Sequence, residues 1–262
     1  MLIDSHCHLD FPELTADESG VLARARTAGV AGMLTIGTRL DQFERVRAIA
    51  ERHDNVWCSV GVHPHEAKEE GQRTPERLIE ATRHPKVVGI GETGLDFYYE
   101  HSPREEQAES FRAHIAASRE TGLPLIVHTR SADAETGDML EEEHGKGAFP
   151  GLIHCFSSGR AVAERALALG LYISISGIVT FKAADELRAI VRDVPLDRLL
   201  VETDAPYLAP IPKRGKTNEP AFVAHTAAKV AELKGVSVAE LEAATTDNFF
   251  RLFTKAERSR CA

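Results

Sequence analysis

The chain has 262 residues, a net charge of −9 and 43% hydrophobic residues, enough to bury a full core without disulfide or metal staples. The acidic balance argues against a basic face that wraps nucleic acid without specificity. Four cysteines lie far apart with no Cys-x-x-Cys pair, which favours reduced thiols in a cytosolic protein. Because no signal-peptide pattern and no run of 18 apolar residues occur, we expect a soluble, cytoplasmic protein without a membrane segment.

Short apolar runs alternate with helical patterns along the whole chain. Proline and capping residues mark helix starts at Ser102-Pro103-Arg104-Glu105, Thr74-Pro75 and Ser237-Val238-Ala239-Glu240. The apolar runs are nearly continuous, as in a parallel sheet that is covered on both faces. We expect eight strands, at Met1–Ser5, Val30–Gly37, Val56–Val62, Val87–Gly91, Leu123–Val127, Gly151–His154, Leu171–Ile175 and Leu199–Thr203.

Eight strands that are each followed by a helix predict an α/β fold, a (β/α)₈ TIM barrel. No Ser/Gly linker, charge block or composition shift interrupts the pattern, so we expect one domain over residues 1–262. The alternative is an open doubly wound sheet. The Gly-x-Gly-x-x-Gly turn expected there after the first strand is absent, which favours the barrel.

Active sites of such barrels lie at the C-terminal ends of the strands. His6 and His8 stand two apart in an extended segment, so they project to the same face. Histidines and carboxylates recur at the later strand ends, namely His63, His65, Glu92, His128, His154 and Asp204. The remaining histidines fall in helices or ordinary loops, and we expect them to be solvated surface residues: His53, His84, His101, His114, His144 and His225.

Four histidines with two carboxylates suit two divalent ions, since imidazole binds zinc, manganese or iron and oxygen ligands accept magnesium. Two neighbouring ions need a bridging anion, and no lysine stands near the end of the fourth or fifth strand to supply a carbamate. Glu92 is the candidate for the bridge. Asp204 could hold one ion and orient or deprotonate a bound water.

Several motifs together resemble the TatD family of metal-dependent hydrolases, deoxyribonuclease-like members of the amidohydrolase barrels. The resemblance runs from Leu2 to about Phe253, and no ligand position departs from the family pattern. The motifs are Asp4-Ser5-His6-Cys7-His8-Leu9-Asp10, Gly61-Val62-His63-Pro64-His65, Gly91-Glu92-Thr93-Gly94-Leu95-Asp96, Pro124-Leu125-Ile126-Val127-His128, His154-Cys155-Phe156-Ser157, Glu202-Thr203-Asp204-Ala205-Pro206-Tyr207 and Arg214-Gly215-Lys216-Thr217-Asn218-Glu219-Pro220.

The resemblance implies hydrolysis of DNA phosphodiester bonds, with His63 near the substrate phosphate. It also implies a set of metal ligands, namely His6, His8, Glu92, His128, His154 and Asp204. We expect a metal-bound hydroxide to attack phosphorus in line while Asp204 takes the proton and His63 steadies the phosphate. The expected cofactors are two divalent ions (Mg, Mn or Zn), and the expected substrate is DNA, as single strands or ends. We expect a monomer without an obligate protein partner.

Further residues allow both a functional and a purely structural interpretation. Asp4 stands two positions before His6, and Glu202 two before Asp204, so we expect each pair to point to the same inward face. Asp4 and Glu202 either orient the ligating imidazoles or form a polar interior layer. Cations in the loops after the fifth, seventh and eighth strands neutralise phosphates or are ordinary surface residues: Arg130, Lys182, Arg214 and Lys216. Cys7 and Cys155 point away from the ligands, as small core residues. The expected substrate contacts are His63, His65, Arg130, Glu202 and Arg214.

Two other functions fit parts of the pattern. The same ligands serve C–N or carboxyl-ester hydrolysis, including deacylation of an aminoacyl ester on RNA, and the acidic charge favours a smaller substrate. A non-catalytic binding or structural barrel would show gaps in the ligand set, and the sequence shows none.

Overall fold

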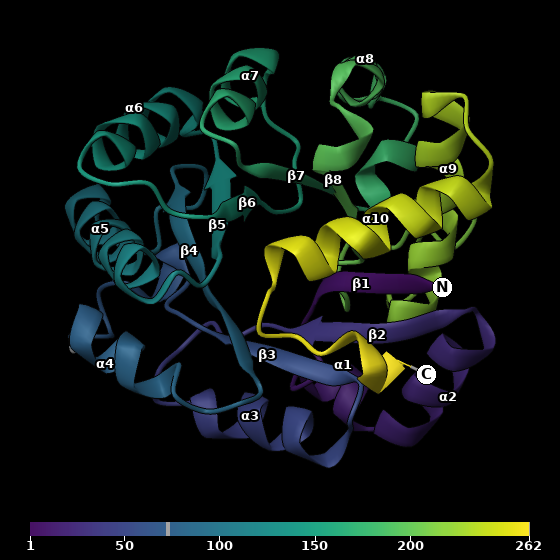
Figure 1. The fold of residues 1–262 in the computed structure, drawn as a ribbon, viewed down its shortest axis with the longest axis horizontal. Coiled ribbons are helices and arrows are strands. Elements are labelled where there is room, and N and C mark those ends of the chain that lie inside the picture. Colours follow the sequence, from purple (N-terminus) through teal and green to yellow (C-terminus); the bar gives the residue numbers. More distant parts are fainter. Residues whose placement is uncertain (72–73, 262) are drawn as a thin grey trace.

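Eight parallel strands form one sheet in sequence order, β1 to β8, in the computed structural model, which describes residues 1–71 and 74–261 (Figure 1). Consecutive strands pair in parallel throughout. The TIM barrel predicted from the sequence is confirmed. The strands are β1 Leu2–Cys7, β2 Val30–Thr35, β3 Val56–Val60, β4 Val87–Asp96, β5 Leu125–Arg130, β6 Gly151–Ile153, β7 Tyr172–Ile175 and β8 Leu199–Val201.

The sheet closes between its first and last strands. Just beyond β8, the amide of Asp204 donates to the carbonyl of His6 at 2.9 Å, and the amide of His8 donates to Ala205 at 2.8 Å. Cys7 and Ala205 form a parallel bridge. The closing contact therefore lies at the C-terminal end of the barrel, and it sets two candidate ligand segments side by side.

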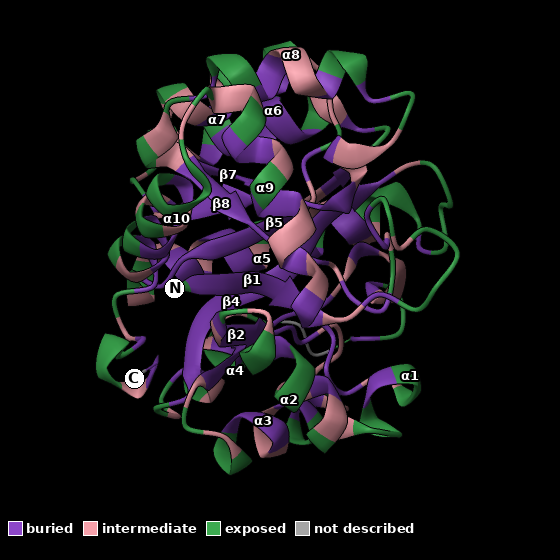
Figure 2. Cartoon of the chain, turned by 90° about the vertical axis from the view of Figure 1, so that its right-hand side faces the viewer, coloured by how far each residue is buried: buried purple, intermediate pink, exposed green. Residues whose placement is uncertain are grey.

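Helices follow the strands and cover the outside of the barrel (Figures 1 and 2). The helices are α1 Pro12–Thr15, α2 Glu18–Thr27, α3 Phe43–Arg52, α4 Pro75–Ala81, α5 Arg104–Thr121, α6 Asp133–Gly145, α7 Arg160–Ala168, α8 Asp185–Asp193, α9 Val223–Lys234 and α10 Val238–Leu252. Short 3₁₀ turns are η1 Pro64–Glu66, η2 Gly177–Thr180, η3 Leu196–Arg198, η4 Pro220–Phe222 and η5 Arg258–Cys261. In the described ranges, no helix combines the length and the apolar character needed to cross a bilayer.

Two of the three helix starts read from the sequence are confirmed. Thr74 accepts the amide of Arg77, and Ser237 forms a full capping box with Glu240. The third helix, α5, begins at Arg104, within its predicted motif, but the predicted capping box is wrong because Ser102 does not cap the helix. The Ser102 hydroxyl instead donates to the carbonyl of His65 and accepts the amide of Lys68, so it fixes the loop after β3.

The apolar core has two parts. A large cluster lies between the strands and the surrounding helices. A second cluster joins residues of all eight strands to Phe249 of α10, the yellow helix that crosses the strands in Figure 1, and to Phe253 just after that helix. The strand residues are Ile3, Leu34, Trp57, Val88, Ile126, Leu152, Tyr172 and Leu200. Alternate residues of a strand share a face. In β5, β6 and β8, a residue of this cluster stands two positions before His128, His154 and Glu202 respectively. These three polar side chains therefore point to the same face of the sheet as the cluster.

Candidate metal centre

Glu92 lies at the middle of the candidate site, 3% exposed, and its two oxygens face different histidines. Oε2 lies 3.3 Å from His6 Nε2 and 3.9 Å from His8 Nε2. Oε1 lies 2.8 Å from His154 Nε2 and 2.9 Å from His128 Nδ1. The Glu92 carboxylate therefore lies between two groups of imidazoles, one at the end of β1 and one at the ends of β5 and β6.

Asp204 completes the β1 side of the site. Its Oδ1 lies 3.4 Å from His8 Nε2 and 3.5 Å from His6 Nε2. His63 approaches from the opposite side, with Nε2 3.4 Å from Glu92 Oε1. The structure thus brings together all six expected metal ligands and the expected phosphate contact His63.

Two glycines hold β4 close to β5 on either side of Glu92. Gly91 and Gly94 adopt φ of +134° and +137°, a range that L side chains rarely adopt. A Cβ on Gly91 would lie 2.6 Å from the carbonyl oxygen of Ile126, and one on Gly94 would collide with the carbonyl of His128. Their absence of side chains lets the Glu92 carboxylate reach the imidazoles of the next strands.

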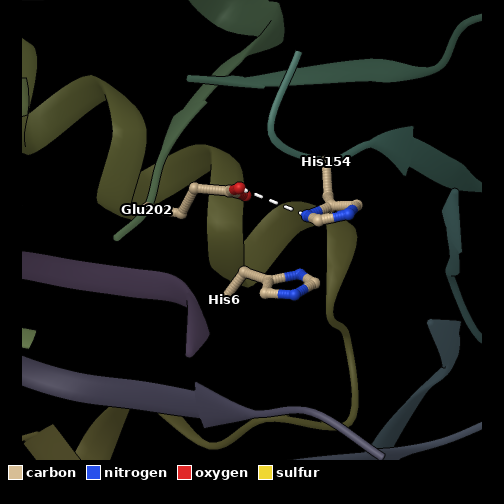
Figure 3. A group of neighbouring side chains, drawn as sticks. All are labelled: His6, His154 and Glu202. Carbon is tan, nitrogen blue, oxygen red and sulfur yellow. Dashed lines mark hydrogen bonds and ion pairs between the residues drawn. The ribbon is translucent and has the colours of Figure 1, made fainter. Parts of the chain in front are cut away.

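A second layer of carboxylates supports the histidines from below. Glu202 Oε1 lies 3.3 Å from His154 Nδ1 (Figure 3). The same oxygen accepts the amide of Cys155 at 2.7 Å. The His154 ring stacks on His6 with centroids 3.9 Å apart and planes within 10°. Asp4 accepts the amide and hydroxyl of Thr203 at 2.9 and 2.6 Å. Both carboxylates have no exposed surface, so their position is fixed by packing.

Asp96 joins the loop after β4 to two of the histidines. Its Oδ2 lies 2.9 Å from His65 Nε2 and 3.2 Å from His128 Nε2. Its Oδ1 accepts the amides of Tyr98 and Tyr99 at 3.0 and 3.1 Å. This single buried carboxylate therefore orients His128 and shapes the adjoining loop.

A cavity of about 680 Å³ opens above these groups. His63, His65 and Arg130 line it, as expected for substrate contacts. Arg214 and Glu202 are not among its lining residues: Arg214 lies over the Phe181 ring at 4.0 Å, and Glu202 is buried beneath His154. Side chains that the sequence reading did not place there also line the cavity, namely Phe11, Tyr99, Cys155 and Tyr207.

Two expectations about single residues are wrong. His114 is not a surface histidine: it is fully buried in α5, accepts the amide of Val62 at 2.9 Å and contacts the carbonyl of Ser110 at 2.7 Å. It therefore anchors the end of β3 to α5. Cys155 is half-buried at the cavity wall, not in the core, and its thiol donates to the Ser176 hydroxyl.

The buried donors fit a divalent cation. Both ring nitrogens of His6, Nδ1 of His8 and Oε2 of Glu202 are buried and have no hydrogen-bond partner among residues 1–71 and 74–261, which is costly unless a ligand satisfies them. Groups of three residues whose candidate ligand atoms all lie within 4.8 Å of one another are His6–His8–Glu92, His63–Glu92–His128 and His6–His154–Glu202. Glu92 belongs to two of these triads. Mixed imidazole and carboxylate donors are the set that zinc, manganese and iron prefer.

The electrostatics keep the central carboxylate ionised. Burial alone would raise the pKa of Glu92, but the charge of His154 and hydrogen bonds from His128 and His154 outweigh it, so the pKa lies well below its usual value. Burial lowers the pKa of His63 to about 4, which keeps this ring neutral near pH 7. Burial alone would lower the pKa values of the candidate ligands His8, His128 and His154, but their neighbouring carboxylates raise them, so a divalent ion that binds there displaces protons from these rings.

The comparisons with known proteins agree with this geometry. The sequence model of the family described as TatD related DNase matches residues 3–254. The chain belongs to the TatD family. It is 48% identical over 255 residues to the metal-dependent hydrolase YcfH of Escherichia coli K12, covering 96% of this chain and 95% of that protein. The TatD family resemblance seen in the sequence is confirmed, and the protein is a metal-dependent hydrolase of this family.

Two further TatD relatives cover nearly the whole chain. It is 38% identical over 262 residues to the 3'-5' ssDNA/RNA exonuclease TatD of Enterobacter lignolyticus, covering 96% of this chain and 98% of that protein. The crystal structure of YJJV, a TatD homolog from Escherichia coli K12, superposes with a TM-score of 0.90 at 32% identity. It covers 97% of this chain and 98% of that one. The shared architecture extends from the first strand to the last helix.

The sequence reading missed Asp96 as a functional residue, although its motif was noted. Glu92, Gly94 and Asp96 are alternate residues and would point to the same face of a strand. The predicted strand ends at Gly91, however, so it does not place Asp96 on the face that carries Glu92. The structure extends β4 to Asp96. Strand parity past the glycines was the signal that would have found it.

Proposed function

We propose that this TatD family hydrolase is a divalent-metal-dependent deoxyribonuclease that cleaves phosphodiester bonds in single strands or at ends. The observation that carries the proposal is that the two carboxylate oxygens of Glu92 face separate sets of imidazoles. A bridging carboxylate with ligands on both sides suits a two-ion phosphoesterase. The printed name of the Enterobacter lignolyticus relative, a single-strand exonuclease, supports the same substrate class.

In this proposal two ions are held by six residues. His6, His8, Asp204 and Glu92 would hold one ion, and Glu92, His128 and His154 would hold the other. Magnesium, manganese and zinc all suit this mixture of oxygen and nitrogen donors. Bound divalent ions supply Lewis acidity, lowering the pKa of water and stabilising charge on phosphate oxygens.

Asp204 is the proposed proton acceptor. Its side chain is 14% exposed at the cavity wall, so it reaches water, while the other candidate carboxylate, Glu92, is buried. Burial would raise the pKa of Asp204, but a hydrogen bond from His8 and the charge of His6 lower it. An ionised carboxylate at the mouth can take a proton from the attacking water.

His63 is the proposed donor to the substrate phosphate. Its Nδ1 accepts the amide of His65 at 3.1 Å, so the proton of the neutral ring sits on Nε2. That nitrogen faces the cavity centre beside Glu92. Arg130 lines the same cavity and supplies positive charge for a phosphate oxygen. Glu202, being buried, orients His154 and does not contact the substrate.

The test is a cleavage assay on end-labelled single-stranded DNA with Mg²⁺, Mn²⁺ or Zn²⁺, with and without chelator. We expect chelator-sensitive cleavage that falls by at least about a hundredfold in Asp204→Asn, since a general base contributes about 10²–10⁴ in rate. The control is Asp185→Asn, which removes an exposed carboxylate on α8 and should leave the rate unchanged. Turnover of amide or carboxyl esters without DNA cleavage would overturn the proposal in favour of an amidohydrolase activity.

A further inference from the structure

Exposed aromatic side chains gather around the mouth of the barrel. Among the described Phe, Tyr and Trp residues, those more than half exposed are Tyr98, Tyr99 and Tyr207, at 61%, 51% and 53%. The first two lie in the loop after β4 and the third in the loop after β8. Tyr99 and Tyr207 both line the cavity above the candidate metal ligands. Exposed apolar rings concentrated at one site indicate a binding surface.

Tyr98, Tyr99 and Arg130 form a compact group, here called the tyrosine platform. The two rings are nearly perpendicular, at 89°, with centroids 4.8 Å apart. The Arg130 guanidinium lies over both, 4.1 Å from the Tyr98 centroid and 4.7 Å from the Tyr99 centroid. His101 stacks on Tyr99 with centroids 5.4 Å apart and planes within 8°. The group therefore combines exposed π surface with a cation.

The positive charge of the platform is not neutralised within the chain. Across residues 1–71 and 74–261, no carboxylate oxygen lies within 4.0 Å of the Arg130 guanidinium, whereas Arg39, Arg165 and Arg119 each have a carboxylate partner. Arg130 lines the cavity and so can meet an anion there. A phosphate oxygen is the anion that an arginine at such a mouth binds well.

The platform is fixed relative to the candidate metal ligands. Asp96 accepts the amides of Tyr98 and Tyr99 through one oxygen and contacts His128 Nε2 through the other. Arg130 ends β5, two residues after His128. The rings and the guanidinium are therefore attached to the same two strands that present Glu92 and His128. A group stacked on the rings would lie at a set position from the reacting centre.

A nucleobase is the ligand that matches this arrangement. It offers a flat π face for the tyrosine rings, and its neighbouring phosphate offers a charge for Arg130. Bases inside a duplex stack on each other and pair, so only an unpaired base can present its face to the rings. Stacking tolerates every base because each has a π face.

We propose that the tyrosine platform is a base-stacking subsite, in which an unpaired base beside the cleaved phosphate packs face-on against one of the Tyr98 and Tyr99 rings and edge-on against the other, while Arg130 pairs with a phosphate oxygen. This inference rests on the proposed deoxyribonuclease function and deepens it. The platform selects single strands over duplexes and is indifferent to sequence.

The kinetic test compares metal-loaded wild-type protein with Y98A/Y99A on a single-stranded oligonucleotide. We expect KM to rise by about 10- to 100-fold, since stacking on an aromatic ring favours binding by about 5- to 150-fold per base. The conservative Y98F/Y99F variant keeps both rings and should restore KM. Val238→Ala removes exposed apolar area on α10 and is the control without effect. Equal KM for wild type and Y98A/Y99A would overturn the platform.

A binding measurement separates the two proposals. An oligonucleotide with 2-aminopurine near its end is titrated with each protein, and base stacking is read as fluorescence quenching. We expect quenching by wild type and Y98F/Y99F and its loss in Y98A/Y99A, with an unchanged thermal unfolding midpoint. Quenching without cleavage would contradict the nuclease proposal alone. Cleavage with quenching that survives the double alanine change, or no quenching by wild type, would overturn the platform.

Discussion

At the scale of single residues, the site depends on carboxylates that each serve more than one partner. Glu92 faces histidines of β1 with one oxygen and histidines of β5 and β6 with the other. In the same way, one Asp96 oxygen contacts His128 and the other accepts the backbone amide of Tyr98 in the loop after β4. Such shared acceptors fix several groups at once, so replacing one of them disturbs more than one contact.

Asp96→Asn tests this sharing directly. Asparagine keeps the size but offers one acceptor oxygen, so either the histidines or the loop amides lose their partner. Because partners that orient a ligating histidine contribute about 10–100-fold to metal affinity or activity, we expect a loss of that size in both. Metal titration and DNA cleavage measure it, with Asp185→Asn as control. Unchanged metal affinity in folded Asp96→Asn would contradict the orienting role.

At the scale of elements, the close approach of β4 to β5 sets the site. Gly91 and Gly94 let the two backbones meet where a Cβ would collide with Ile126 or His128. β4 is also the longest strand, running from Val87 to Asp96. Its length places both Glu92 and Asp96 against the imidazole of His128 in the next strand.

Gly94→Ala should therefore destabilise the protein and weaken metal binding together. The added methyl group meets a backbone carbonyl at a φ that alanine rarely adopts, and we expect a loss of about 2–3 kcal/mol in the free energy of unfolding. Gly145→Ala is the matched control, because a Cβ there meets nothing within 4 Å at the end of α6. Alanine at that position should be neutral or slightly stabilising. Urea unfolding measures both variants, and equal stability losses would refute the close-approach account.

Much of this element layout was predictable from the sequence. All eight strands are confirmed, because continuous apolar runs between glycine and proline signals are strong local patterns. The ends of β4 and β5 were not predictable in the same way. The continuation past Gly91 contains glycines and a carboxylate, which read locally as a loop, and only pairing with β5 makes it a strand.

In the candidate site, too, some residues were predictable from the sequence and others were not. Residues at strand ends, such as His128 and Asp204, follow from the barrel topology once the strands are assigned. Tyr98 and Tyr99, by contrast, take their place at the site through contacts across β4, β5 and the loop between β4 and α5, which no local pattern encodes. His114 was misread for the converse reason: its polar type predicts exposure, but two hydrogen bonds satisfy it in the interior.

At the scale of the whole molecule, charge is distributed unevenly. The chain carries a net charge of −9. Even so, cations at the end of β5 and in the loops after β7 and β8 lack carboxylate partners within 4.0 Å in the described part of the chain: Arg130, Lys182, Lys213, Arg214 and Lys216. Elsewhere, surface arginines such as Arg24 and Arg52 are paired with acids. Free positive charge at the barrel mouth favours an anionic substrate, and the acidic remainder disfavours non-specific binding.

The central claim is that Glu92 bridges two divalent ions at the mouth of the barrel. The most direct test is the metal content of wild type and Glu92→Gln after loading and desalting, measured by elemental mass spectrometry. Glu186→Gln, an exposed change on α8, serves as the control. We predict about two ions per chain in wild type and control, and a loss of most of the metal in Glu92→Gln because both halves of the site lose their shared charge. Equal metal content in all three proteins would contradict the account.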